Sequence, residues 1–220
     1  MITAHGGALK TGRNSRRYFE AVERGEIVSD ALEVDVRERG GRLFISHLCP
    51  LSARNKISVD YVLEFAKAHG KTVNFDIKQS KLFLPVLELA KRHAAEDFLL
   101  FTGATQPEHI AYLSVGVVYA NDCFFTKTGL KYIENDVKGL KAYIDSFNNP
   151  RLKGINVNYK RVTDAFLKSC KKEGLGVSLY TVDNEKALKK YIPCGFDNIT
   201  TNRPDLALKI KNQYTIGGKI

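Results

Sequence analysis

Short apolar, β-branched runs alternate with longer amphipathic stretches along all 220 residues of this chain. Apolar residues that recur every three or four positions are typical of helices, and short apolar runs bounded by turn residues are typical of buried strands. Eight runs read as strands: 1–4, 31–36, 72–77, 98–101, 115–119, 154–157, 177–182 and 198–200. Eight segments read as helices: 16–24, 59–68, 82–93, 108–113, 130–147, 162–173, 185–191 and 205–211. This alternation favours βα units and a parallel sheet.

One further extended run, 42–47, follows the second strand after only the turn residues 38–41. A link this short permits a hairpin but no parallel crossover. Eight βα units in about 220–250 residues are the size of a (β/α)8 barrel. We therefore expect an α/β fold, a single (β/α)8 TIM barrel domain over residues 1–220, with a short hairpin excursion after strand two. The alternative is a doubly wound open sheet, but no glycine-rich dinucleotide fingerprint follows the first strand.

The composition indicates an ordinary globular protein, with 44% hydrophobic and 26% charged residues. No apolar run approaches the roughly 20 residues of a membrane span. The N-terminus leaves no room for a signal peptide, so the sequence predicts a cytoplasmic protein. Its four cysteines are scattered and form no CxxC pair, which predicts free thiols and argues against disulfides or a zinc site.

The net charge of +10 is spread through helical segments. We interpret most of it as solvated helix faces that favour encounter with a phosphorylated substrate. No aromatic-interleaved basic stripe or recognition motif is present, so a nucleic-acid partner is not expected.

Two acidic side chains, Glu33 and Asp35, interrupt the second strand-like run. Residues two apart on a strand face the same side, so both carboxylates lie together, opposite Leu32, Val34 and Val36. Carboxylates at this range repel each other unless one is protonated or a cation binds between them. The pair therefore predicts a functional site.

Other polar residues are expected near this pair, because chemistry in a (β/α)8 barrel lies at the C-terminal ends of the strands. His5 follows strand one, the hairpin return ends at His47, and strand three carries Asp76 and Lys78. Three carboxylates suit a hard cation, Ca²⁺ or Mg²⁺. The two histidines are candidate general acid and base, and Lys78 is a candidate phosphate contact. A purely structural ion pair between Asp76 and Lys78 is the alternative.

Several motifs occur in the order seen in one enzyme family. They are Ala4-His5-Gly6-Gly7, Arg13-Asn14-Ser15, Glu33-Val34-Asp35-Val36, Ser46-His47-Leu48, Asp76-Ile77-Lys78, Leu179-Tyr180-Thr181-Val182-Asp183 and the stretch from Phe196 to Pro204. With these motifs the chain resembles the glycerophosphodiester phosphodiesterases, metal-dependent barrels of the phosphatidylinositol-phospholipase-C-like superfamily. The resemblance spans nearly the whole chain.

The resemblance implies hydrolysis of a small glycerophosphodiester to glycerol-3-phosphate and an alcohol. A divalent cation, Ca²⁺ or Mg²⁺, is then expected on Glu33, Asp35 and Asp76. His5 and His47 are expected to supply acid and base catalysis. The expected substrate contacts are Lys78 and Arg13 at the phosphate and Tyr180 at the alcohol.

The sequence departs from the family pattern at Gly6, Arg13 and Leu48, where the family has arginine, glutamate and aspartate. These changes leave open a catalytically lapsed barrel that binds a phosphorylated ligand or a partner protein. A related phosphodiesterase acting on lysophospholipid or sphingolipid headgroups is a further alternative. Phe124-Phe125 is its candidate apolar entrance.

Overall fold

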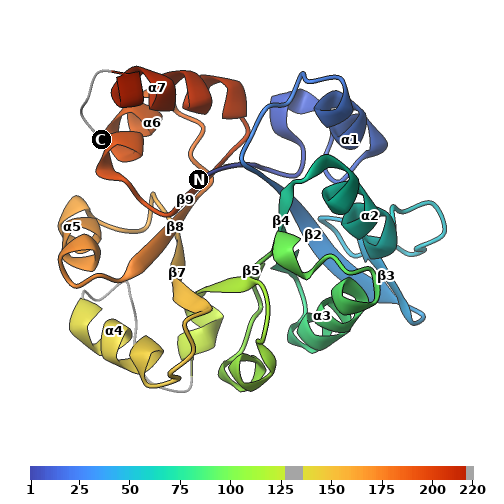
Figure 1. Ribbon diagram of the computed structural model, residues 1–220, viewed down its shortest axis with the longest axis horizontal. Coiled ribbons are helices and arrows are strands. Elements are labelled where there is room, and N and C mark those ends of the chain that lie inside the picture. Colours follow the sequence, from blue (N-terminus) through green and yellow to red (C-terminus); the bar gives the residue numbers. More distant parts are fainter. Residues whose placement is uncertain (127–135, 217–220) are drawn as a thin grey trace.

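The computed structural model describes residues 1–126 and 136–216, in which a ring of helices surrounds a parallel sheet (Figure 1). The strands are β1 (Ile2–Ala4), β2 (Ala31–Arg39), β3 (Arg42–Ile45), β4 (Thr72–Ile77), β5 (Leu99–Gly103), β6 (Val117–Ala120), β7 (Leu152–Asn158), β8 (Gly176–Tyr180) and β9 (Asn198–Thr201). All of the runs expected to be strands form strands, with ends shifted by a few residues.

The sheet closes on itself because β1 pairs in parallel with both β2 and β9. The order of the remaining strands is β9-β8-β7-β6-β5-β4-β2, all parallel, so the described residues form a closed eight-stranded barrel. β3 lies outside the ring and pairs antiparallel with β2, with Val36 opposite Ile45. The predicted (β/α)8 barrel with its hairpin excursion is confirmed, and the open-sheet alternative is wrong.

The helices around the barrel are α1 (Arg16–Glu23), α2 (Val59–His69), α3 (Phe83–Arg92), α4 (Val137–Asp145), α5 (Asp164–Lys172), α6 (Glu185–Tyr191) and α7 (Pro204–Ile216). Side-chain caps set several of their starts: Ser58 accepts a hydrogen bond from the Tyr61 amide, and Thr163 accepts one from Phe166. Such caps satisfy amides that lack an intrahelical partner.

Two expected helices differ from the structure. The segment 108–113 forms a 3₁₀ helix, Pro107–Tyr112, rather than an α-helix. The His109 ring accepts a hydrogen bond from the Gln106 amide at 3.0 Å, which satisfies one donor at the start of this short turn. For the expected helix 130–147, α4 begins only at Val137, after the Asp136 cap, and the part over 130–135 lies outside the described residues.

Alternating side chains divide the barrel strands between two environments. On β2, Leu32, Val34 and Val36 are fully buried in the hydrophobic core. The barrel interior is partly polar: Thr3 donates to Asn198 at 2.7 Å, and Asn198 donates to Ser178 at 3.0 Å. Buried polar groups are costly unless they are hydrogen-bonded, so this network stabilises the barrel interior below the site.

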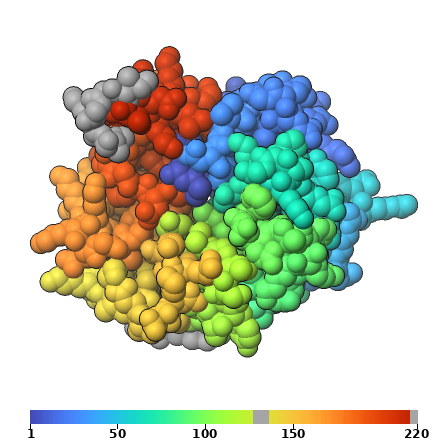
Figure 2. Space-filling model, in the orientation of Figure 1, coloured from blue at the N-terminus to red at the C-terminus, as the bar shows by residue number. Residues whose placement is uncertain are grey.

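The chain begins near the centre of the face shown in Figure 2, inside the ring of helices drawn in Figure 1. On the same view, the segment that follows β3 projects from the body at the right edge. In the described part of the chain, no helix is both long and apolar enough to span a bilayer. All four cysteines are free, as predicted.

Candidate active site

The eight residues predicted to form the site all line one cavity of about 500 Å³: His5, Arg13, Glu33, Asp35, His47, Asp76, Lys78 and Tyr180. They come from β2, β4 and β8 and from the segments that follow β1, β3 and β4. In a barrel, these strand ends and the loops after them form the mouth. The structure therefore brings together every predicted site residue.

The three carboxylates lie at neighbouring levels of two paired strands. In the register between β2 and β4, Glu33 is opposite Asn74 and Asp35 is opposite Asp76. One oxygen from each of Glu33, Asp35 and Asp76 lies within 4.8 Å of the other two. This clustering follows from the strand period of two, which turns Glu33, Asp35 and Asp76 toward the barrel interior.

Glu33 is a buried acid whose ionisation is strongly opposed. Burial raises its pKa well above the usual 4.5, and the charges of Asp76 and Asp35 raise it further. Lys78 and a hydrogen bond from Thr200 only partly offset these effects. A cation that approached Glu33 would favour its ionised form.

Lys78 joins the other two carboxylates. Its Nζ lies 2.5 Å from Asp35 Oδ1 and 2.5 Å from Asp76 Oδ2. For Asp35, burial opposes ionisation, but Lys78 and the hydrogen bond from Asn14 outweigh it, so the pKa is lowered. For Asp76, burial dominates over Lys78, and the pKa is raised. The ion pair between Asp76 and Lys78, which the sequence left as an alternative, thus exists and includes Asp35 as well.

His47 is held from two directions. Its Nδ1 lies 3.2 Å from Asp35 Oδ2, and the Arg37 guanidinium donates to the His47 carbonyl oxygen at 2.8 Å. The His47 side chain is still 40% exposed, so a ligand in the cavity can reach the ring. Leu48 stands where the family has an aspartate, and Asp35 supplies the carboxylate contact to this histidine.

His5 contacts a different carboxylate of the cluster from His47. Its Nε2 is 3.6 Å from Glu33 Oε1, and its Nδ1 is buried without a hydrogen-bond partner among the described residues. Burial lowers the pKa of His5, partly offset by the charge of Asp35. The neutral imidazole is therefore its main form near pH 7, which suits a general base.

Asn14 is a site residue that the sequence reasoning missed. Its side chain donates to Asp35 Oδ2 at 2.7 Å and accepts from the Asp35 amide at 3.0 Å. The residue has a left-handed backbone, with φ of 51°. Asparagine tolerates this conformation better than most residues, so its identity is a signal that the sequence offers. The contact with Asp35, 21 residues further along the chain, cannot be read from the sequence.

Gly103, at the end of β5, was also missed. Its φ is +81°, and a β-carbon there would collide with Asp76 Oδ1 and with the backbone of Ile77. Its amide donates to Asn121 Oδ1 at 2.7 Å, and Asn121 and Asn156 line the same cavity. The position of Asn121 and Asn156 near the ends of β6 and β7 is the sequence signal that could have identified them as site residues.

Gly6 fills a place with little room for a side chain. A β-carbon at this position would lie 2.9 Å from the Glu33 carbonyl oxygen, closer than real contacts allow. An arginine, which the family has here, would require the backbone to shift. The departure at Gly6 is therefore built into the local packing of this chain.

The carboxylate cluster fits a hard divalent cation. Ca²⁺ binds oxygen at 2.3–2.6 Å, so opposite ligands lie about 5 Å apart. The oxygens of Glu33, Asp35 and Asp76 lie within that span. Ca²⁺ and Mg²⁺ both prefer such ligands.

These features define a (β/α)8 barrel with an oxygen-rich acidic site at its mouth. Residues 124–206, less than half of the chain, match the model of the glycerophosphoryl diester phosphodiesterase family. The predicted resemblance to this family is thereby confirmed, on a match that covers the later strands. No curated protein matches the chain.

Solved structures of the same fold cover nearly the whole chain. A phosphodiesterase of Oleispira antarctica in complex with the product sn-glycerol-3-phosphate has a TM-score of 0.76 at 15% identity, covering 96% of each chain. A glycerophosphodiester phosphodiesterase of Parabacteroides distasonis has a TM-score of 0.73 at 19% sequence identity, and the match covers 97% of each chain. A glycerophosphodiester phosphodiesterase of Thermotoga maritima has a TM-score of 0.63 at 19% sequence identity, and the match covers 95% of this chain and 97% of the other. At these identities the similarity establishes the shared barrel.

Proposed function

We propose that this chain, acting as one domain, is a metal-dependent glycerophosphodiester phosphodiesterase. The observation that carries the proposal is the grouping of Glu33, Asp35 and Asp76 with two histidines in one cavity. The family match over residues 124–206 and the product named for the Oleispira antarctica structure support the same substrate class. A small phosphodiester fits a cavity of about 500 Å³.

Seven of the eight predicted residues have roles that their surroundings support. A divalent cation held by Glu33, Asp35 and Asp76 would act as a Lewis acid on a phosphate oxygen. Lys78 and Arg13 would bind the remaining phosphate charge. His5, neutral near pH 7, is suited to accept the proton of the attacking hydroxyl. His47, held by Asp35, is suited to protonate the leaving alkoxide.

The direct test is release of glycerol-3-phosphate from a mixture of glycerophosphodiesters, with Ca²⁺ or Mg²⁺ added and then removed by a chelator. We expect release that depends on the cation and falls at least 100-fold in His47→Ala, because general acid–base catalysis contributes about 10²- to 10⁴-fold. Equal release by wild type and variant, or release in the presence of chelator, would contradict the proposal.

A second function is favoured by one observation, the contact of Lys78 with both Asp35 and Asp76. This ammonium already neutralises part of the cluster, and Arg13 stands where the family has a glutamate. A lapsed barrel that binds a phosphorylated ligand is the corresponding alternative. Calorimetric titration with Ca²⁺ and Mg²⁺ separates the two: tight binding lost in Asp76→Asn supports the enzyme, and no binding supports the lapsed barrel.

A further inference from the structure

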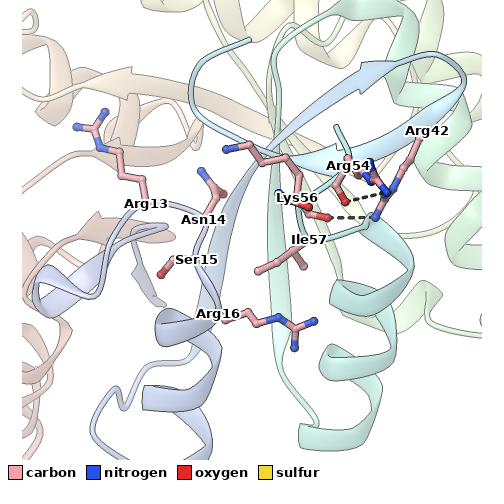
Figure 3. Close-up of a pocket in the computed structure, with 9 residues that line it drawn as sticks. Arg13, Asn14, Ser15, Arg16, Arg42, Arg54, Lys56 and Ile57 are labelled. Carbon is pink, nitrogen blue, oxygen red and sulfur yellow. Dashed lines mark hydrogen bonds between the residues drawn. The ribbon is translucent and has the colours of Figure 1, made fainter. Parts of the chain in front are cut away.

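A second cavity, of about 650 Å³, lies beside the candidate active site, between the start of α1 and the segment between β3 and α2 (Figure 3). Its charged lining residues are all cationic: Arg13, Arg16, Arg42, Arg54 and Lys56. The lining holds no aspartate or glutamate among the described residues. We call the cavity lined by these five cations the basic cavity. Concave surfaces lined by one sign of charge concentrate ligands of the opposite sign.

Three of the five cations are available to a ligand. Over residues 1–126 and 136–216, no carboxylate pairs with Arg13, Arg54 or Lys56. In Figure 3 the Lys56 side chain extends toward the side of the cavity where Arg13 and Asn14 lie. Some exposed cations elsewhere in the described residues do have a carboxylate partner, as Lys81 does in Glu38 at 2.9 Å. Unpaired cations gathered in one cavity indicate an anionic ligand.

The other two cations have structural contacts. Arg42 donates to the carbonyl oxygens of Arg54 at 3.4 Å and Lys56 at 3.1 Å, which fixes the segment that carries both residues (Figure 3). The Arg16 guanidinium lies 5.8 Å from the centre of the Tyr61 ring. Asn14, Ser15 and Arg16 mark the start of α1, where the helix dipole adds partial positive charge.

The basic cavity adjoins the candidate active site. Arg13 lines both cavities, and Asn14, which lines the basic cavity, donates to Asp35 in the acidic cluster. A molecule whose phosphodiester lies against Asp35 and Lys78 can therefore extend past Arg13 among Arg54 and Lys56. The group that it places there must be anionic, because five cations repel an ammonium such as that of choline or ethanolamine.

We propose that the basic cavity binds a second phosphate, carried by the alcohol of the substrate, so that the enzyme prefers diesters of phosphorylated alcohols. This inference rests on the proposed phosphodiesterase function and narrows its substrate class. A recessed cavity favours a compact anion over a flat membrane surface. The rival occupant is an anionic bilayer, which would use the same cations together with the exposed Leu48 and Leu51 on the same segment.

The test compares two substrates that differ by one phosphate monoester, glycerophosphoinositol and glycerophosphoinositol 4-phosphate, with glycerophosphocholine as a cationic reference. The variant is Arg54→Gln/Lys56→Gln. The matched control is Arg92→Gln/Lys172→Gln, which removes the same charge from exposed sites on α3 and α5. We expect the wild type to prefer the phosphorylated substrate. In the Arg54→Gln/Lys56→Gln variant, the KM for glycerophosphoinositol 4-phosphate should rise about 10- to 100-fold with little change in kcat, because charge-assisted hydrogen bonds are lost.

The unphosphorylated substrate and the control variant should show no such change. Equal KM effects on both substrates, or equal effects of both double variants, overturn the inference. Rate loss confined to lipid substrates in phosphatidylcholine vesicles containing phosphatidylserine assigns the cavity to a membrane and also overturns it.

A binding measurement separates this inference from the proposed activity. Glycerophosphoinositol 4-phosphate is titrated into His47→Ala protein, with and without Arg54→Gln/Lys56→Gln. Binding that needs Arg54 and Lys56 supports the basic cavity. If the wild type then hydrolyses no substrate, the absence of activity counts against the proposed phosphodiesterase and not against the basic cavity. Binding that is unchanged by the double variant counts against the cavity.

Discussion

The Asp35 carboxylate lies 3.2 Å from Nδ1 of His47, although Asp35 is on β2 and His47 is in the segment that follows β3. The same Asp35 oxygen accepts a hydrogen bond from Asn14, and its other oxygen contacts Lys78. One buried carboxylate thus links a histidine, an amide and a lysine. Its geometry decides whether the proposed acid, base and phosphate contacts align.

His47→Gln is expected to lower kcat for glycerophosphodiester hydrolysis about 10²- to 10⁴-fold, since glutamine cannot transfer a proton at this position. Affinity for Ca²⁺ should be nearly unchanged, because His47 contacts the cluster only through Asp35. Steady-state kinetics and calorimetry measure the two quantities. His93→Gln is the control, since His93 lies 3.0 Å from Asp60 and does not line the cavity. Similar losses in both variants would remove His47 from the mechanism.

The buried Glu33 predicts a pH-dependent stability. Because its pKa is raised in the folded protein, the folded state binds a proton more tightly than the unfolded state. In chelator, the contribution of Glu33 to the free energy of unfolding should therefore fall as pH rises from about 4.5 toward the raised value, by at most ~1.4 kcal/mol per pH unit.

Urea unfolding of wild type and Glu33→Gln across this pH range measures that contribution as the difference between the two proteins. We expect the wild type to lose stability relative to the variant as pH rises, and added Ca²⁺ to reverse the loss in the wild type alone. A difference that does not vary with pH would show that Glu33 titrates normally.

Asn14→Ala is expected to destabilise the protein by about 1.5–3 kcal/mol more than Asn148→Ala. The control is closely matched, because Asn148 has a φ of 47° against 51° for Asn14 and is exposed. Replacing either asparagine adds similar backbone strain, but only Asn14→Ala removes hydrogen bonds to Asp35. Urea denaturation gives both values, and equal losses would show that the Asp35 contacts add nothing.

Gly103→Ala should weaken Ca²⁺ affinity by tenfold or more, since the new methyl group must displace the Asp76 carboxylate or the Ile77 backbone. Gly25→Ala is the control: its φ of +72° imposes a similar backbone penalty, but nothing lies within 4 Å of the added carbon. Calorimetric titration compares them. Unchanged affinity in Gly103→Ala would mean that Asp76 is not held at the position that the cluster requires.

The sequence predicted the barrel because its strands carry a strong periodic signal. Leu32, Val34 and Val36 alternate with Glu33 and Asp35, and this alternation identified both the buried face and the polar one. Parallel register then placed Asp76 beside Asp35. The segment 108–113 had helical spacing, but Pro107 starts a short 3₁₀ turn instead, and His109 stacks on Phe83 with ring centres 4.7 Å apart.

The missed residues depend on contacts that periodicity does not encode. Asn14 acts through a left-handed backbone and a partner on another strand, and Gly103 acts by leaving space for Asp76. The basic cavity was also missed, because its cations come from separate segments and read as part of a diffuse net charge. Only the fold brings Arg13 and Lys56 to one surface.

Closure of the barrel has a consequence for self-association. Among the described residues, every strand of the ring is paired on both sides, so β3 holds the one free edge of the sheet. The Ile45 amide donates to the Ile57 carbonyl at 2.9 Å, and Phe44 bridges to Ser58, so the chain covers that edge itself. Exposed edges are templates for aggregation. Arg42 holds the carbonyls of Arg54 and Lys56 and so keeps this segment over the edge of β3. The same contact therefore disfavours pairing of β3 with a strand of a neighbouring molecule.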